Sequence, residues 1–316
     1  MPKNPTDNSG DLHQNEDLTR SQKAIVEAGI FGVTKFGSII FMPLATLSTL
    51  KQSSPRGTSY ADTINGVLDK SGIQGFYKGF TPTALRLAGK EAAIGPIIKH
   101  TSQFTKECLH PDIVKKNPEA GFIISAPLNA AISTYGIGYL DRCRIHAMTS
   151  EEGVLKFVKD THKESGISGL GKEMFKGSGI NYANTTLGIA GYHVIHQELK
   201  RIAVEFNGQS DLSTTQEMGL SLTSGALVTA TRSPLAVAGA IVMKSNSPVP
   251  SATMSDAFSH IFKEHGIKGF YIGIGPSLAL GAVSSLVYQG SLDLIQKIEE
   301  MEKNSSQGKS VSNARN

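Results

Sequence analysis

The chain contains the stretch Ser71-Gly72-Ile73-Gln74-Gly75-Phe76-Tyr77-Lys78-Gly79, and two later stretches repeat much of it. These are Ser165-Gly166-Ile167-Ser168-Gly169 and His265-Gly266-Ile267-Lys268-Gly269-Phe270-Tyr271-Ile272-Gly273. Their first glycines lie roughly a hundred residues apart, which indicates one structural unit repeated in tandem. The sequence therefore predicts three units of similar fold, a stronger constraint than overall composition provides.

Apolar residues are concentrated in long uncharged runs, although hydrophobic residues make up only 39% of the chain. Ala120 to Leu140 and Ile272 to Leu292 contain no Asp, Glu, Lys or Arg. Each run is long enough to cross a hydrocarbon layer about 30 Å thick. A soluble protein with buried helices is the alternative. The many small residues in these runs favour membrane helices, which associate through close backbone contact.

Each unit has the same predicted anatomy: a long, weakly charged helix, a polar linker, a short amphipathic helix and a second long helix. Pro43 and Pro234 interrupt the first long helix of units one and three. Apolar residues at helical spacing define the short helices: Ala61, Ile64, Val67 and Leu68; Val154, Phe157 and Val158; Ala257, Ile261 and Phe262. The predicted fold is all-α, with six transmembrane helices in a threefold-pseudosymmetric bundle and three short surface helices.

We expect repeats at residues 23–108, 118–206 and 214–300, between disordered polar tails at 1–22 and 301–316. The first tail lacks the apolar core of a signal peptide and the arginines of a transit sequence. Two cysteines, Cys108 and Cys143, argue against a disulfide framework. The net charge of +4 has no accompanying basic and aromatic array, so we expect no nucleic-acid partner.

The repeated stretches resemble the signature of the mitochondrial carrier family: Gly, two spacers, Gly, two aromatic or apolar residues, a spacer, Gly, two spacers, Pro, three spacers and Arg. Unit one matches at Gly72, Gly75, Phe76, Tyr77, Gly79, Pro82 and Arg86. Unit three matches through Pro276 but has Leu280 at the arginine position. Unit two carries a four-residue insertion before Phe175, with Ile180 and Asn184 in place of Pro and Arg. The resemblance implies a monomeric, multi-pass carrier of the mitochondrial inner membrane, with its short helices on the matrix side.

The family closes its two sides with ion pairs between repeats, and most of these charges are missing here. On the matrix side, units one and three keep only the kink prolines, Pro43 and Pro234, while unit two keeps charges after Tyr139. By resemblance, the remaining gate positions are Asp141, Arg144, Gln197, Lys200, Asp293 and Gln296. The missing charges therefore argue against strict exchange coupling and leave uniport, exchange and proton symport open.

Substrate-contacting residues of the family lie near the motif arginine on the even-numbered helices. The matching positions are Arg86, Lys90, Asn184, Thr185, Leu280 and Gly281, and Lys35 adds a further positive charge. Arg86 and Lys90 share a helix face, and intramembrane basic residues usually face a wet cavity. The alternative is that Arg86 pairs with Glu91 or extends to the membrane edge.

The excess of basic residues predicts an anionic metabolite, either a nucleotide such as ATP or a di- or tricarboxylate such as citrate or 2-oxoglutarate. Tyr139 in place of proline, together with the missing arginine at Leu280, resembles the fungal citrate–oxoglutarate carrier group. The alternative from another class is a transport-degenerate carrier that acts as a membrane scaffold or insertase. Membrane lipid is a further expected partner, including cardiolipin at the glycine-rich helix N-termini.

Enzymatic chemistry finds little support in the residues. His193 and His196 have a spacing that suits two metal ligands, but a third is not apparent, so we expect histidines that face the membrane edge and no bound metal or cofactor. The acidic run at 299–302 and the polar tail after it resemble secretion signals of injected bacterial effectors, which would imply host mitochondria. Composition alone favours an ordinary helix end with a solvated tail.

Overall fold

The computed structural model describes residues 25–30, 32–34, 38–54, 57–86, 91–208, 212–244, 247–249 and 253–313, and only the backbone at 91, 93 and 299–313. All regular elements in these ranges are helices. The predicted tail at 1–22 lies outside them. The all-α prediction is confirmed, and four helical segments are long and apolar enough to cross a membrane: Ile25–Gln52, Ala120–Ile137, Thr214–Met243 and Ile267–Ile298.

The first repeat begins with helical residues 25–30 and 32–34 and a 3-10 turn, η1 (Ser38–Phe41), followed by α2 (Met42–Gln52). The short helix α3 (Tyr60–Ser71) comes next, and Ser59 and Asp62 cap its first turn reciprocally. The turn η2 (Ile73–Tyr77) then leads to α4 (Phe80–Ala84) and α5 (Glu91–Glu107). This repeat therefore follows the predicted order of elements.

The second repeat comprises α6 (Pro111–Lys116), α7 (Ala120–Ile137), α8 (Tyr139–Thr149), α9 (Val154–Met174) and α10 (Ser178–Asn207). A break separates α7 from α8 at Gly138, one residue before Tyr139, which holds the place of Pro43 and Pro234 in the other repeats. Only glycine fits there, because a Cβ at Gly138 would overlap the carbonyl group of Thr134. The second repeat thus interrupts its first long helix without a proline.

The third repeat contains α11 (Thr214–Met243), α12 (Met254–His265), the turn η4 (Ile267–Tyr271) and α13 (Ile274–Asn313). Helix α11 is continuous through Pro234. Helix α13 reaches Asn313, so the structure has helix where the sequence predicts a disordered tail from residue 301. No proline interrupts this segment, and Met, Glu, Lys and Gln are good helix formers that let α13 continue.

The repeated glycines have the same backbone geometry in all three units. Gly72, Gly166 and Gly266 have φ between 58 and 64° with ψ near −160°, and Gly166 keeps this geometry inside α9. The next turn that recurs in all three repeats is made by Gly79, Gly177 and Gly273, whose φ angles lie between 74 and 77°. More residues separate Gly166 from Gly177 than separate the corresponding glycines of the other two repeats. This difference locates the predicted insertion in the last turns of α9.

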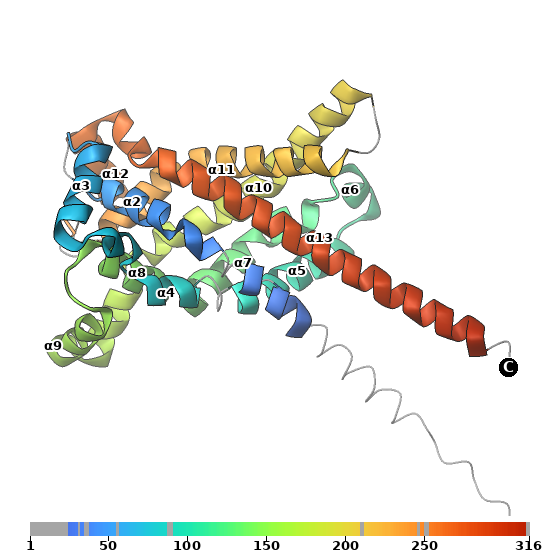
Figure 1. Cartoon of the computed structure of the whole chain (residues 1–316), viewed down its shortest axis with the longest axis horizontal. Coiled ribbons are helices and arrows are strands. Elements are labelled where there is room, and N and C mark those ends of the chain that lie inside the picture. Colours follow the sequence, from blue (N-terminus) through green and yellow to red (C-terminus); the bar gives the residue numbers. More distant parts are fainter. Residues whose placement is uncertain are drawn as a thin grey trace, which may run out of the picture.

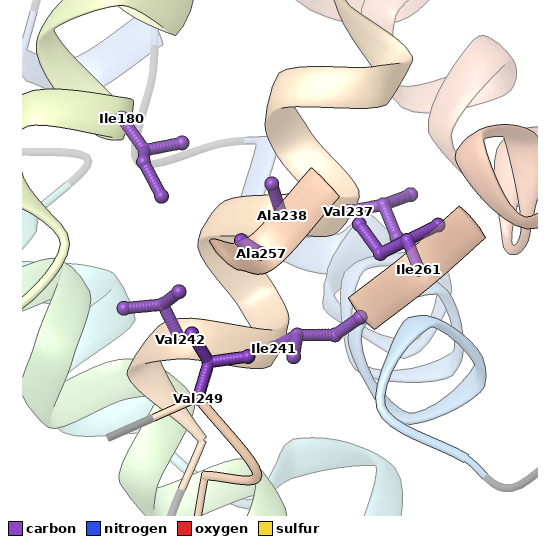
Figure 2. Close-up of a cluster of buried hydrophobic side chains, with 8 residues drawn as sticks. All are labelled: Ile180, Val237, Ala238, Ile241, Val242, Val249, Ala257 and Ile261. Carbon is purple, nitrogen blue, oxygen red and sulfur yellow. The ribbon is translucent and has the colours of Figure 1, made fainter. Parts of the chain in front are cut away.

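The long helices run lengthwise, and α3, α9 and α12 gather at one end, here called the short-helix end; α6 lies at the opposite end (Figure 1). A buried apolar cluster fixes α12 to α11 and to the start of α10 (Figure 2). Its members are Ile180, Val237, Ala238, Ile241, Val242, Val249, Ala257 and Ile261. The cluster thus holds a surface helix rigidly against the helices that line the interior.

Candidate functional site

A cavity of about 470 Å³ lies inside the bundle and receives residues from all three repeats. The charged residues that line it, among those the structure describes, are Arg86, Asp141, Arg144 and Arg232. Three guanidinium groups thus face one carboxylate, which leaves a net charge of +2. The predicted contact residues Asn184, Thr185, Leu280 and Gly281 also line the cavity, whereas Lys35 and Lys90 lie outside the described residues.

The carboxylate of Asp141 has two basic neighbours. Its Oδ1 forms a direct ion pair with Nε of Arg86, which follows α4, and lies 3.8 Å from Nε of Arg144. Nδ2 of Asn181 donates to Oδ2 over 3.1 Å. Arg86 is thus joined to the side chains for which the sequence predicts a gate role, whereas the side chain of Glu91 lies outside the described part of the chain. Arg86 and Arg144 therefore share one buried carboxylate, which offsets one of their two positive charges.

Arg232 is the lining residue that the sequence analysis missed. It lies on α11, two residues before Pro234, whereas the family motif places its basic residue after the proline. A Cβ added to Gly188 of α10 would meet the terminal nitrogen of Arg232, so the guanidinium occupies the space left by this glycine. The signal for it was a single basic residue in the interior of a long apolar helix, the pattern of an intramembrane functional residue.

Several uncharged polar groups face the same cavity without a hydrogen-bond partner among the described residues. These are the hydroxyl groups of Thr83 and Ser133 and the amide oxygen of Asn184. Buried polar groups normally have partners, because each unpaired group costs about 1–3 kcal/mol. A solute that enters the cavity could therefore form hydrogen bonds with these groups.

Gly281 has a packing role in addition to its place in the cavity wall. A Cβ at Gly281 would lie 2.9 Å from the carbonyl oxygen of Gly225, so these two glycines let α11 and α13 approach to backbone contact. Helix packing therefore accounts for a glycine at position 281 without a role in substrate binding. Asn184 and Thr185 remain as the polar pair at the predicted contact positions.

The short-helix end is held by bonds from basic side chains to backbone carbonyl groups. Nζ of Lys244, after α11, donates to the carbonyl oxygen of Ser53, after α2, over 2.9 Å. A terminal nitrogen of the buried Arg142, in α8, donates to the carbonyl oxygen of Met243 over 2.6 Å, and Arg142 also pairs with Glu173. These bonds connect the ends of α2, α8 and α11, where the family uses an ion-pair ring.

At the opposite end, acids near the starts of long helices pair with bases on their neighbours. The pairs are Glu27 with Lys99 at 2.7 Å, Glu119 with His193 at 2.9 Å, and Glu217 with Lys200 at 2.6 Å. Lys200, one of the predicted gate residues, belongs to these pairs. Asp293 accepts a bond from Gln289 of its own helix, Gln197 is half-buried and Gln296 is exposed.

The expectation that His193 faces the membrane edge is wrong, because its side chain is buried and lines the cavity. The ring stacks on Phe122 at 4.1 Å, and the pair with Glu119 satisfies one nitrogen.

Tyr192 and Tyr288 meet edge to face at 6.0 Å, and this contact joins α10 to α13. In the described part of the chain, no group of three His, Cys, Asp or Glu side chains is placed to hold a metal ion.

Comparison with known proteins identifies this architecture. The family model described as "Mitochondrial carrier protein" matches residues 23–104 and 210–302. The citrate/oxoglutarate carrier protein of Saccharomyces cerevisiae is 21% identical over 81% of this chain and 83% of its own length. Mitochondrial substrate carrier family protein W of Dictyostelium discoideum is 22% identical over 86% of both chains. The mitochondrial arginine transporter BAC1 of Arabidopsis thaliana is 23% identical over 67% of this chain and 71% of its own.

Proposed function

The chain belongs to the mitochondrial carrier family, and on that premise we propose that it moves an anionic metabolite across the mitochondrial inner membrane. As a family member it is a multi-pass carrier-type solute transporter and not an enzyme. The short helices of the family lie on the matrix side, so the short-helix end is the matrix end. The observation that carries the anion proposal is the cavity with three arginines and one aspartate.

The charge of the cavity decides between solute classes. A cavity with a net charge of +2 among its described lining residues attracts anions, because charges in a low-dielectric interior interact strongly. A cation such as arginine, which the Arabidopsis relative transports by its name, would be repelled. The name of the yeast relative, citrate and oxoglutarate, agrees with an anion. ATP and citrate are therefore the two substrates to test first.

The remaining predicted residues take roles around this cavity. Asn184 and Thr185 supply hydrogen bonds, and Lys90 and Lys35 add positive charge. Asp141 and Arg144 influence whether the cavity opens to the matrix side, and Lys200 influences whether it opens to the opposite side. Pro43 and Pro234 mark the places where the odd-numbered helices bend. Cardiolipin binds at the helix N-termini that follow Gly177 and Gly273, where backbone N–H groups face an anionic headgroup.

Uptake by purified protein in liposomes tests the proposal. Labelled ATP and labelled citrate are offered separately, and the double variant Arg86→Gln, Lys90→Gln is compared with Lys70→Gln, which removes an exposed charge outside the cavity. We expect the double variant to insert into the membrane but lose uptake, because charge-assisted hydrogen bonds contribute about 1.5–3 kcal/mol each. Normal uptake by the double variant would contradict a role for Arg86 and Lys90 in anion transport, and uptake of neither ATP nor citrate by wild type would contradict the anion carrier.

A membrane scaffold or insertase is the second candidate, and the loss of the family's gate charges favours it. Arg142 and Lys244 connect the helix ends through carbonyl groups, an arrangement that also suits a bundle that stays closed. A wild-type protein that inserts and folds but takes up neither ATP nor citrate would move this candidate ahead.

A further inference from the structure

We propose that Arg232 is the anion anchor of the cavity, the residue on which a carboxylate or phosphate group of the solute docks. This inference rests on the proposed anion transport and names the residue that determines affinity. It shifts the main binding role away from Arg86, which the sequence alone favours.

The first support is the distribution of charge among the lining residues. The carboxylate of Asp141 already faces Arg86, and Arg144 lies 3.8 Å from it. Asp141 is the only described acid that lines the cavity. Within the described part of the chain, Arg232 has no ion pair within 4.0 Å and no hydrogen bond, and Asp141 attracts it only from a longer distance. An incoming oxyanion can therefore bind Arg232 without displacing a protein carboxylate, whereas at Arg86 it must compete with Asp141.

The second support is the glycine that makes room for the guanidinium group. The terminal nitrogen of Arg232 occupies the place where any side chain at Gly188 would begin. Gly188 lies one turn beyond Asn184 on α10, and both residues line the cavity. This glycine thus lets Arg232 extend toward the face of α10 that carries the unpartnered amide oxygen of Asn184. A planar guanidinium group suits bidentate binding of a carboxylate or phosphate.

The third support comes from the repeat. Two residues before the break, the first repeat has Phe41 and the second has Ile137. A side chain that the fold itself needed would be expected in all three units. Arg232 is confined to one unit and is half-buried, and an unpaired charge inside the bundle destabilises a protein, so its presence calls for a ligand. Arg232 is therefore explained by the solute rather than by the architecture.

The test uses the full-length protein in liposomes with labelled ATP and labelled citrate in separate arms. For Arg232→Gln we expect KM for the transported anion to rise about tenfold to a hundredfold, which corresponds to about 1.4–2.8 kcal/mol. Arg232→Lys keeps the charge but not the planar fork, so its KM should lie between those of wild type and Arg232→Gln. The arm that shows uptake identifies whether the docked group is a phosphate or a carboxylate.

Two glycine variants separate the position of Arg232 from its charge. Gly188→Ala displaces the flexible end of Arg232 while every charge remains, and should raise KM as Arg232→Gln does. Gly191→Ala is the matched control, because its Cβ would make only ordinary contacts with Val228, 3.8 Å or more away. We expect Gly191→Ala to transport as wild type does.

Thermal unfolding in detergent distinguishes a binding role from a structural one. Without solute, Arg232→Gln should unfold at the same temperature as wild type or higher, because an unpaired charge is removed. With ATP or citrate, wild type should be stabilised and Arg232→Gln should not. If Arg232→Gln unfolds at a lower temperature than wild type without solute, or if its KM equals that of an active wild type, the role of Arg232 is overturned. The proposed anion transport would still stand in either case. If wild type neither transports nor binds either anion, the proposed transport itself fails.

Discussion

The ammonium group of Lys244 lies 2.9 Å from the carbonyl oxygen of Ser53, and this bond connects the matrix ends of α11 and α2. The two residues are far apart in sequence and belong to the third and first repeats. Arg142 makes the corresponding connection from α8 to Met243 at the end of α11. The contacts between repeats at this end therefore use backbone acceptors, which remain in place when the family's acidic partners are lost, and we expect them to favour its closed state.

Lys244→Gln should weaken this closure. A hydrogen bond from a charged group contributes about 1.5–3 kcal/mol, so its loss shifts the population toward the matrix-open state. We expect faster uptake into empty liposomes relative to uptake into liposomes preloaded with the same anion. Lys263→Gln, an exposed lysine on α12, is the control and should leave this ratio unchanged. An unchanged ratio for Lys244→Gln would count against the closing role of the bond.

Asp141→Asn should leave Arg86 and Arg144 without their shared counter-ion. The net charge of the described lining residues would rise from +2 to +3. We expect a lower KM for the anion and a lower turnover, because a more tightly held solute is released more slowly. Arg144→Gln keeps the direct ion pair of Arg86 with Asp141 and should mainly alter the leak of the anion through the protein. Kinetics of the two variants in the same liposomes check this, and a raised KM for Asp141→Asn would contradict it.

Pro234→Leu and Pro43→Leu should lower transport more than they lower the yield of folded protein. A proline in a helix removes one backbone hydrogen bond, which makes bending there easier. Pro127→Leu in α7 is the control for a proline inside a helix but away from the repeat's break. Uptake is measured per amount of folded protein. Equal losses of fold and uptake at Pro234 would argue that the proline serves packing only.

Ile261→Ala should destabilise the contact between α12 and α11. Ile261 is fully buried in the cluster with Val237, and removing such a side chain typically costs about 2–5 kcal/mol. Ile267→Ala is the control, since Ile267 is 71% exposed. Thermal unfolding in one detergent compares the two variants with wild type. A similar midpoint for both variants would show that the cluster adds little to stability.

Much of the fold was predictable because glycine geometry and uncharged runs leave a direct trace in the sequence. Gly72, Gly166 and Gly266 recur and have matching backbone angles in the structure. The break at Gly138 was not predicted, since the sequence analysis associated a break with proline. Here a glycine that fits against Thr134, one residue before the place of the proline, makes the break instead.

The cavity was predicted less completely than the fold. Asn184 and Thr185 line it as the repeat alignment implied, but Arg232 falls outside the motif spacing and was missed. The acceptors for Lys244 and Arg142 could not be found from side-chain patterns, because every residue carries a carbonyl group. Only the path of the chain decides which carbonyl group a lysine reaches.

The backbone contact of α11 with α13 has a mechanical consequence. Gly225 and Gly281 bring the helices together, while the hydroxyl groups of Thr229 and Ser285 donate to carbonyl groups of their own helices, at 2.7 and 3.0 Å. The side chain of Thr229 fits against Gly281 and that of Ser285 against Gly225, so the two helix surfaces interlock and resist sliding past each other. Near the matrix, Ser48 of α2 lies 2.6 Å from Ser277 and fixes the start of α13. Helix α13 is thus fixed to α2 at its start and to α11 further along, so a movement of either helix would carry α13 with it.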